Sequence, residues 1–529
     1  MKRPEQKGGA ARGGAVSGRT ALLIGLWLGM AFVYLLNPVF DVDVFWQIRL
    51  GQLMRERRAL VTEDPFTYTH AGQPVPTIGW LAQLGLAGAH GLGGWPLVHL
   101  LNALLLAAAF AVAGWSAMSH EGGRRPSLVA VACAVVLGFL VSLSNCDVRP
   151  QSFGLLCFAL FLHVCGTGRP WPRRVPLLAL ILVVWQNSHP SMSLAMVAAG
   201  ALAAGTALER RRGRPGRSVR AYAGGLALAG VSQLATPMGF GIFAVSARNV
   251  EVSRLWLGVS EWLPPWSEPV RAPMAMFWVA LAFSLALMIR LRRQLRWDDA
   301  LLFIAATAVA LSAARFGLFW GLAMVPVWAR WFEEGKPPHL LRWRGEARLA
   351  GRPCLLAGVV GLVVLLAVPP RLRGSLMHAE LPVQGVARLE RALPQGRVYN
   401  FREWGGPLIL AGSPRWQVAM DGRLYVFDRA DWREYFQAAR GEIPLGALLA
   451  RHRPDAFFLS PRHQRGLVRQ IREARGWREV YADPGCVMLV RRHARHGPER
   501  EGRPPASGRP AQDLSSHGGG SGHAAAPGR

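Results

Sequence analysis

A series of long apolar segments runs through the first two thirds of this chain. Hydrophobic residues make up 51% of the 529 residues and charged residues only 18%, whereas soluble proteins carry about 25% charged residues. Because about 20 apolar residues cross a bilayer core, we count about eleven candidate spans. They lie at residues 20–40, 95–118, 127–144, 152–166, 175–189, 191–208, 221–238, 272–289, 299–314, 316–332 and 353–369. The fold class predicted is a mainly α-helical, polytopic membrane protein.

The arginines assign the two sides of the predicted membrane. A net charge of +29 first suggests a nucleic-acid partner. The basic residues, however, gather in short loops on alternate ends of the apolar segments, which is the positive-inside pattern. These basic stretches are residues 2–19, 124–125, 169–174, 210–220, 290–296 and 336–348. We therefore expect a cytoplasmic N-terminus, an extracytoplasmic C-terminus and no nucleic-acid partner.

Composition divides the chain into parts with different expected structures. The boundaries are a basic cytoplasmic N-terminus at 1–19, a transmembrane domain at 20–370 with an extracytoplasmic loop at 41–94, a soluble α/β domain at 371–495 and a disordered tail at 496–529. Within the loop, residues 43–58 and 80–90 favour helices that lie in the membrane interface. Strands of the α/β domain are predicted at 397–400, 417–420, 456–459, 479–481 and 487–490.

Two aspartates, Asp41 and Asp43, follow directly on the first apolar segment. Their simplest role is a polar anchor at a helix end. Two carboxylates that converge on one point also suit a divalent cation such as Mg²⁺ or Mn²⁺. In a third interpretation one carboxylate is a general base and the other tunes its pKa, with Asp41 slightly favoured as the base. Asp64 is expected first as a turn or cap residue, and it is also the next candidate acid, as a substrate-binding residue.

Further polar residues fall on the same predicted outer face. Arg149 and Arg315 lie in short turns where the positive-inside pattern should deplete arginine. They either extend their charged ends to the membrane surface or bind a phosphate, which a guanidinium contacts in bidentate fashion. His189, at a hairpin tip, is a helix-end cap, a substrate contact or a general acid–base group. Glu251 and Glu261 are expected to be inert surface acids.

The outer-face motifs together resemble those of a broad group of bacterial multi-span proteins similar to the GT-C superfamily of membrane glycosyltransferases. The motifs are DVDVFWQIRLGQ at 41–52, TEDPFTYTHAGQP at 62–74, IGWL at 78–81, VRPQ at 148–151, WQNSHPSMS at 185–193, EWLPP at 261–265, AARFGLFW at 313–320, VYNFREWGGPLI at 398–409 and MDGRLYVFDR at 420–429. The resemblance implies that Asp41 or Asp43 takes the role of the family's acid in the first loop, as base or metal ligand.

The resemblance also implies an activity. It predicts transfer of a sugar from a polyprenyl-phosphate-linked donor to an extracytoplasmic glycan, lipid or protein, by a protein of the bacterial inner membrane in contact with its lipids. From their positions, and not from the resemblance, we expect Arg149 and Arg315 to hold the donor phosphate, and His189 and Asp64 to contact substrate. Two alternatives stay open from the residues alone. One is a transporter or flippase of a lipid-linked or anionic substrate, and the other is a non-catalytic membrane scaffold.

Overall fold

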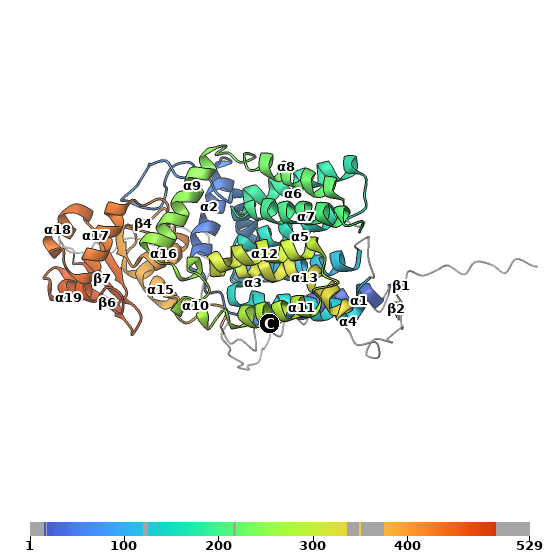
Figure 1. Ribbon diagram of the computed structural model, residues 1–529. Coiled ribbons are helices and arrows are strands. Elements are labelled where there is room, and N and C mark those ends of the chain that lie inside the picture. Colours follow the sequence, from blue (N-terminus) through green and yellow to red (C-terminus); the bar gives the residue numbers. More distant parts are fainter. Residues whose placement is uncertain are drawn as a thin grey trace, which may run out of the picture.

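The computed structural model describes residues 15–16, 18–119, 125–214, 218–335, 349–350 and 375–492. The predicted span at 353–369, the disordered tail at 496–529 and most of the basic N-terminus at 1–19 lie outside these residues. The described chain forms a helical body and a smaller C-terminal domain at one end of it (Figure 1).

The helical body contains the segments that hydropathy singled out. Its long helices are α1 (Gly18–Leu36), α3 (Trp80–Ser119), α4 (Leu128–Ser142), α5 (Gln151–Gly166), α6 (Trp171–Ser188), α7 (Ser193–Arg211), α8 (Val219–Ser232), α11 (Ala275–Arg290), α12 (Trp297–Ser312) and α13 (Gly317–Glu334). By length and composition, two helices in the described part can cross a membrane, Trp80–Ser119 and Leu128–Asn145. The span count and the membrane topology therefore stay predictions, while the helical class is confirmed.

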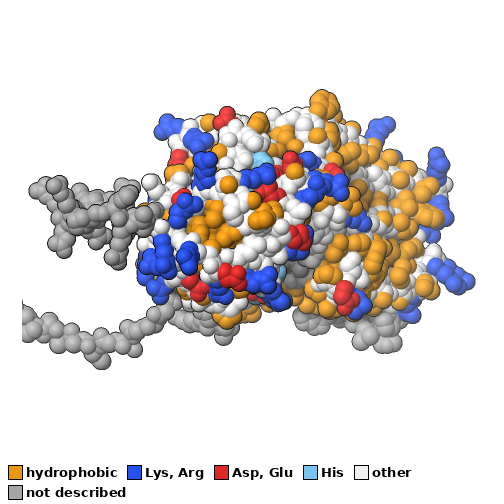
Figure 2. Space-filling model, turned by 90° about the vertical axis from the view of Figure 1, so that its left-hand side faces the viewer, with side chains coloured by type: hydrophobic (Ala, Val, Ile, Leu, Met, Phe, Trp, Pro, Cys, Tyr) orange, Lys and Arg blue, Asp and Glu red, His pale blue; other side chains and the backbone are white. Residues whose placement is uncertain are grey.

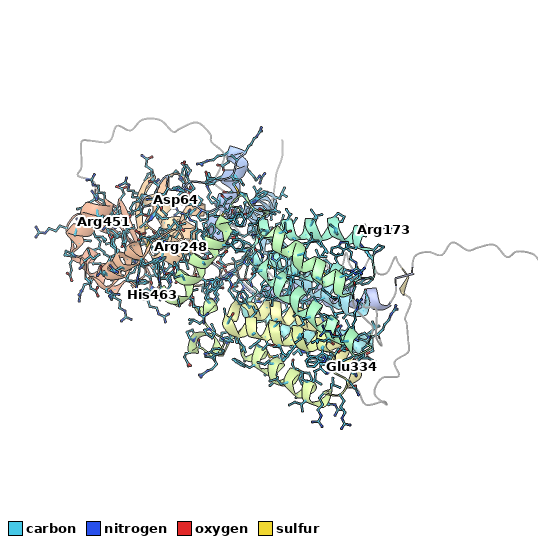
Figure 3. All side chains as sticks on the ribbon, turned by 45° about the horizontal axis from the view of Figure 1, so that its top comes forward. Asp64, Arg173, Arg248, Glu334, Arg451 and His463 are labelled. Carbon is cyan, nitrogen blue, oxygen red and sulfur yellow. The ribbon has the colours of Figure 1, made fainter. Side chains whose placement is uncertain are left out.

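Large apolar side chains on the outside of the helical body indicate contact with lipid. Leu180, Val231, Val279, Ile289 and Ile304 are each more than half exposed, which is costly in water. Figure 2 looks onto the C-terminal domain, where charged side chains of both signs cover the near face, and hydrophobic side chains gather toward the right-hand edge. Arg173 and Asp64, predicted on opposite sides of the membrane, lie toward opposite ends of the molecule (Figure 3).

Glycines let α4 and α13 pack closely in the centre of the body. A Cβ added at Gly138 would lie 2.8 Å from the carbonyl oxygen of Gly321. Large buried rings of α13, including Trp320, Trp328 and Trp331, fill the space beside this contact. Small residues at a helix crossing allow the backbones to approach and are typical of membrane helices.

Shorter helices connect the body to the C-terminal domain. The helix predicted at 43–58 is confirmed as α2 (Asp43–Arg57), while its place in a membrane interface stays a prediction. The second is the start of α3, which breaks at Gly93 and Gly94, where the positive φ of Gly94 suits glycine. The later outer loop contains α9 (Gly241–Val250), a π-helical turn η2 (Glu251–Trp256), a 3₁₀ turn η3 (Ser260–Trp262) and α10 (Glu268–Arg271). The turn η1 (Leu143–Asn145) follows α4, and η4 (Ala314–Phe316) joins α12 to α13.

The C-terminal domain is a five-stranded mixed sheet with helices. Its elements are α15 (Val383–Ala392), β3 (Gly396–Asn400), η5 (Arg402–Trp404), α16 (Gly405–Gly412), β4 (Trp416–Val418), α17 (Arg429–Arg440), α18 (Leu445–His452), β5 (Ala456–Leu459), α19 (Arg465–Glu473), β6 (Trp477–Ala482) and β7 (Val487–Arg491). The strand order is β4-β3-β5-β7-β6, with β3 parallel to both neighbours. Each predicted strand overlaps one of these strands. A separate pair, β1 (Ala15–Val16) and β2 (Leu349–Ala350), is antiparallel.

The first outer loop pairs with the edge strand of this sheet. The amide of Tyr68 donates to the carbonyl of Val418 at 3.2 Å, and the amide of Val418 donates to the carbonyl of Phe66 at 3.0 Å. From the other side, the guanidinium of Arg248 in α9 donates to the carbonyls of Tyr425 and Phe427, each at 3.0 Å. Backbone pairing from the first loop and the side chain of Arg248 from the second therefore hold the C-terminal domain against the helical body.

Candidate active site

Asp41 and Asp43 are fixed at the start of α2. The amide of Asp43 donates to Oδ1 of Asp41 at 2.6 Å, and the indole Nε1 of Trp46 donates to Oδ1 of Asp43 at 3.1 Å. Asp43 also occupies the first turn of α2, where the helix dipole favours negative charge. Asp41 is buried and Asp43 is partly accessible. The two aspartates are therefore held next to each other by one turn of chain, and the convergence of their carboxylates on one point stays a prediction.

A row of charges of alternating sign extends from Asp41 across the helical body. Arg149, in the turn between α4 and α5, pairs with Asp41 and with Glu261. Nη1 of Arg315, in η4, pairs with Oε1 of Glu261 at 3.1 Å, and its guanidinium lies 4.3 Å from the ring centroid of Trp262. The structure thus brings together four residues from turns that are far apart in the sequence.

Glu261 completes this row, although the sequence suggested an inert surface acid. Its side chain is only 22% exposed and joins Arg149 to Arg315. Burial alone would raise its pKa, but the two guanidinium groups outweigh burial and lower the pKa of Glu261 to about 2. Glu261 is therefore an ionised bridge between two arginines. The motif EWLPP contained the residue, but no local pattern indicates its two partners.

Asp43 carries the opposite pKa shift. Burial and the neighbouring charge of Asp41 raise the pKa of Asp43 to about 8, against the opposing effects of the Trp46 hydrogen bond and Arg149. A carboxyl group with a pKa near the operating pH can accept a proton and release it again. Asp41, in contrast, is paired with Arg149 and accepts the Asp43 amide. The free proton-accepting group of the pair is therefore Asp43.

His189 lies within the electrostatic reach of the same row. Its Nδ1 is 2.8 Å from the hydroxyl of Ser191, which also accepts from the indole of Trp185 at 3.0 Å. The charges of Arg315, Glu261 and Arg149 act on its imidazole. A neutral imidazole can donate or accept one hydrogen bond to a substrate, and a substrate-contact role for His189 stays a prediction.

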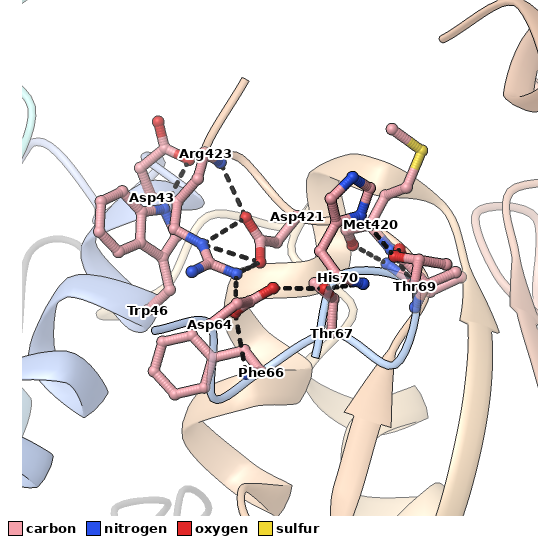
Figure 4. Close-up of polar contacts among 12 residues, drawn as sticks. Asp43, Trp46, Asp64, Phe66, Thr67, Thr69, His70, Met420, Asp421 and Arg423 are labelled. Carbon is pink, nitrogen blue, oxygen red and sulfur yellow. Dashed lines mark hydrogen bonds and ion pairs between the residues drawn. The ribbon is translucent and has the colours of Figure 1, made fainter. Parts of the chain in front are cut away.

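Asp64 lies in a different cluster. Nη2 of Arg423 donates to Oδ1 of Asp64 at 2.7 Å, and the same guanidinium contacts both carboxylate oxygens of Asp421 (Figure 4). All three side chains are buried, and Asp64 also accepts from the hydroxyl of Thr67. Asp64 therefore clamps the first loop to the C-terminal domain. The structure does not place it among the charges around Arg149, and its substrate-binding role stays a prediction.

The clamp sets Gly422 against the carboxylate of Asp43. A Cβ added at Gly422 would lie 2.9 Å from Cγ of Asp43 and 3.4 Å from Nε1 of Trp46. A Cβ added at Gly406 would collide with the carbonyl oxygen of Val42. The motifs around Trp404 and Asp421 thus contribute backbone that forms one wall of the candidate site.

The side chains around Asp41 and Asp43 offer few ligands for a divalent cation. In the described parts of the chain, no group of three His, Cys, Asp or Glu side chains is placed to hold a metal ion. Mg²⁺ often binds through one or two carboxylates and phosphates, but here the guanidinium of Arg149 already compensates Asp41. The residues as arranged do not fit a cation.

Comparison with solved structures identifies the architecture. The apo oligosaccharyltransferase of Archaeoglobus fulgidus aligns over 90% of this chain and 74% of its own, with a TM-score of 0.56 and 11% identity. ArnT from Cupriavidus metallidurans, bound to undecaprenyl phosphate, aligns over 91% of this chain and 99% of its own, with a TM-score of 0.53 and 13% identity. The chain has the GT-C fold. The comparison therefore confirms the GT-C architecture that the motifs predicted.

Sequence comparisons add no closer relative. No protein-family model matches the GT-C-like chain, and a search of curated proteins found no match. Because the structural neighbours share 11–13% of residues, the GT-C likeness establishes the fold, and residue roles rest on the geometry above.

Proposed function

We propose that this protein transfers a sugar from a polyprenyl-phosphate-linked donor to an acceptor at the junction of the helical body and the C-terminal domain. The observation that carries the proposal is a row of ion pairs that runs from Asp41, whose carboxylate accepts the amide of Asp43, to Arg315. At one end Asp43 offers a proton acceptor, and at the other end the guanidinium of Arg315 offers a positive charge. Glycosyl transfer from a lipid phosphate needs both groups.

A small apolar pocket of about 20 Å³ lies where the row ends and marks an apolar surface beside Arg315. Phe316, the residue after Arg315, lines it together with side chains of α5, α7, α12 and α13. Val197 lines the same pocket and is 38% exposed, so this apolar surface reaches the outside of the body, where the chain of a lipid-linked donor would lie. Two structural neighbours hold such lipids: ArnT with undecaprenyl phosphate and the archaeal oligosaccharyltransferase AglB with dolichol-phosphate.

Arg315 is the better placed of the two arginines for the phosphate. Arg149 contacts two carboxylates, Asp41 and Glu261, whereas Arg315 pairs in the described structure with Glu261 alone. Its guanidinium keeps further N–H groups for a phosphate oxygen. His189, which is within electrostatic reach of Arg315, can add a hydrogen bond to the same phosphate.

The proposed reaction uses Asp43 as the base and Arg315 as the cation that binds the phosphate. The acceptor hydroxyl loses its proton to Asp43 as its oxygen bonds to the anomeric carbon of the sugar. The bond between that carbon and the phosphate oxygen breaks, and polyprenyl phosphate leaves with the bonding electrons, its charge stabilised by Arg315. Because the phosphate is already a good leaving group, positioning and charge stabilisation carry most of the barrier reduction. The proposed location is the outer face of a bacterial inner membrane.

Transfer of radiolabelled sugars from undecaprenyl phosphate, measured with the full chain in proteoliposomes, tests the proposal. Loss of a general base costs about 10²–10⁴-fold, so we expect Asp43→Asn to lose transfer by that factor. Glu63→Gln is the matched control, since Glu63 is an exposed acid of the same loop. Transfer that survives in both Asp41→Asn and Asp43→Asn would refute the assignment. Flux of donor without a covalent product would favour the transporter alternative.

The phosphate site has its own test. We expect undecaprenyl phosphate to raise the melting temperature of the purified protein, and Arg315→Gln to abolish that rise. Arg254→Gln is the control, because Arg254 is exposed on η2 in the same outer region. An unchanged rise in the Arg315 variant would show that the phosphate binds elsewhere.

A further inference from the structure

A second cavity of about 240 Å³ lies between the first outer loop and the C-terminal domain. Tyr68 of the loop forms one wall, and α17 and α18 form another. Arg397 and Tyr399 of β3 line it together, because side chains two residues apart on a strand point to the same face. The row of charges described above contributes no residue to this cavity.

Aromatic rings and paired polar groups alternate around the cavity. Tyr68, Tyr399 and Tyr435 contribute rings. Asp431 is 3.2 Å from Nε2 of His70, and Glu434 is 2.8 Å from Nε2 of His452 and 2.9 Å from Arg451. The guanidinium of Arg397 lies 5.5 Å from the ring centroid of Tyr68. Because each acid has a basic partner, the wall offers many hydrogen-bonding atoms and little net charge.

This lining matches the chemistry of a sugar ring. A saccharide has an apolar C–H face that packs on tyrosine rings, and neighbouring hydroxyl groups that pair with a carboxylate or a guanidinium. The mixed charges disfavour a strongly anionic or cationic ligand, and the polar half of the wall disfavours a lipid. At 240 Å³ the cavity is smaller than pockets for drug-sized ligands, which measure about 300–1,000 Å³. It therefore suits one sugar unit.

One short stretch of chain, residues 420–422, connects the cavity to the candidate active site. Met420 lines the cavity, and Gly422, two residues later, contacts the carboxylate region of Asp43. Two residues span at most roughly 7 Å, which is on the order of the length of one sugar ring. A glycan bound in the cavity can therefore present its next unit to Asp43.

We propose that this cavity is a subsite for the acceptor, and that the acceptor is a glycan of at least two sugar units. The inference rests on the proposed function for the role of the site as an acceptor subsite, but saccharide binding itself does not. Arg397 and Glu434 supply the hydrogen bonds that hold the distal unit, and the tyrosine rings pack on its face. Both residues are specificity determinants and take no part in the chemistry.

Saturation-transfer NMR with the purified full chain tests binding on a panel of neutral and amino mono-, di- and oligosaccharides. We expect Arg397→Ala and Glu434→Gln each to weaken binding about tenfold or more, the usual cost of losing a hydrogen bond to a charged group. Arg478→Ala is the control, since Arg478 is an exposed arginine on β6 at the other edge of the same sheet. Melting curves of each variant check that it folds.

The outcomes separate this inference from the proposed function. In the transfer assay the two cavity variants should raise KM for oligosaccharide acceptors and leave kcat unchanged. Saccharide binding that depends on Arg397 and Glu434 in a chain without transfer activity would support the cavity and refute the transferase. No binding by any saccharide at millimolar concentration, or binding that neither variant weakens, would overturn the inference.

Discussion

Replacing Gly422 with alanine would test whether the C-terminal domain forms a wall of the active site. The new Cβ would lie 2.9 Å from Cγ of Asp43 and closer still to its Oδ1, whereas carbon atoms pack at about 3.5–4.0 Å. The carboxylate must therefore move by about 1 Å, because the ion pairs of Arg423 with Asp64 and Asp421 hold the backbone on either side. The movement also breaks the hydrogen bond from Trp46.

A displacement of about 1 Å at a reacting group costs about 10²-fold in rate, so we expect Gly422→Ala to lose that much transfer activity. Initial rates in proteoliposomes measure it, and a melting curve checks that the variant folds. Gly446→Ala is the matched control, since a Cβ at Gly446 meets no atom within 4 Å. A Gly422→Ala rate within about threefold of the wild type, or an equal loss in Gly446→Ala, would refute the reasoning.

Three further predictions concern charge. Because the pKa of Asp43 is raised to about 8, the transfer rate should fall about tenfold for each pH unit below 8 as the base takes up its proton. The unfolded carboxyl ionises near pH 4, so the native state loses stability as pH rises from about 4 to 8. Asp43→Asn, which cannot ionise, should therefore gain melting temperature over the wild type more at pH 8.5 than at pH 5, and an equal gain at both would contradict the shift. Arg423→Met should lower the free energy of unfolding by about 3–5 kcal/mol, because it leaves Asp64 and Asp421 as buried, unpaired carboxylates; denaturant titration measures this, and a change under 1 kcal/mol would disagree. Since Arg149 compensates Asp41, EDTA should leave transfer unchanged, and loss of activity restored by Mg²⁺ or Mn²⁺ would show that a cation replaces this pairing.

Features set by local sequence could be predicted well. The apolar helices follow from hydropathy, and the five strands of the C-terminal domain follow from short β-branched and aromatic runs between turn residues. The helix that starts at Asp43 was predicted from its mixture of apolar residues and arginines. These features depend on neighbours in the chain, so one sequence is enough to find them.

Features set by distant contacts could not be predicted. Glu261 gains its role from Arg149 and Arg315, which are 112 and 54 residues away. Asp64 was predicted as a turn residue or a substrate-binding acid, yet its partner Arg423 is 359 residues away. The preference for Asp41 as base also depended on spacing alone. Only the fold shows that Arg149 occupies Asp41 and leaves Asp43 free.

The pairing of residues 66–68 with β4 has a consequence for the biosynthesis of this protein. The loop is made early and must wait for more than 300 further residues before its partner strand and Arg423 exist. Until that last part of the chain has been synthesised and has folded against the loop, the wall at Gly422 is missing and Asp43 stays open to water. A water-filled site leaves the carboxyl with an ordinary pKa. We therefore expect a half-made chain to lack the proposed transfer activity until the loop and the C-terminal domain have joined.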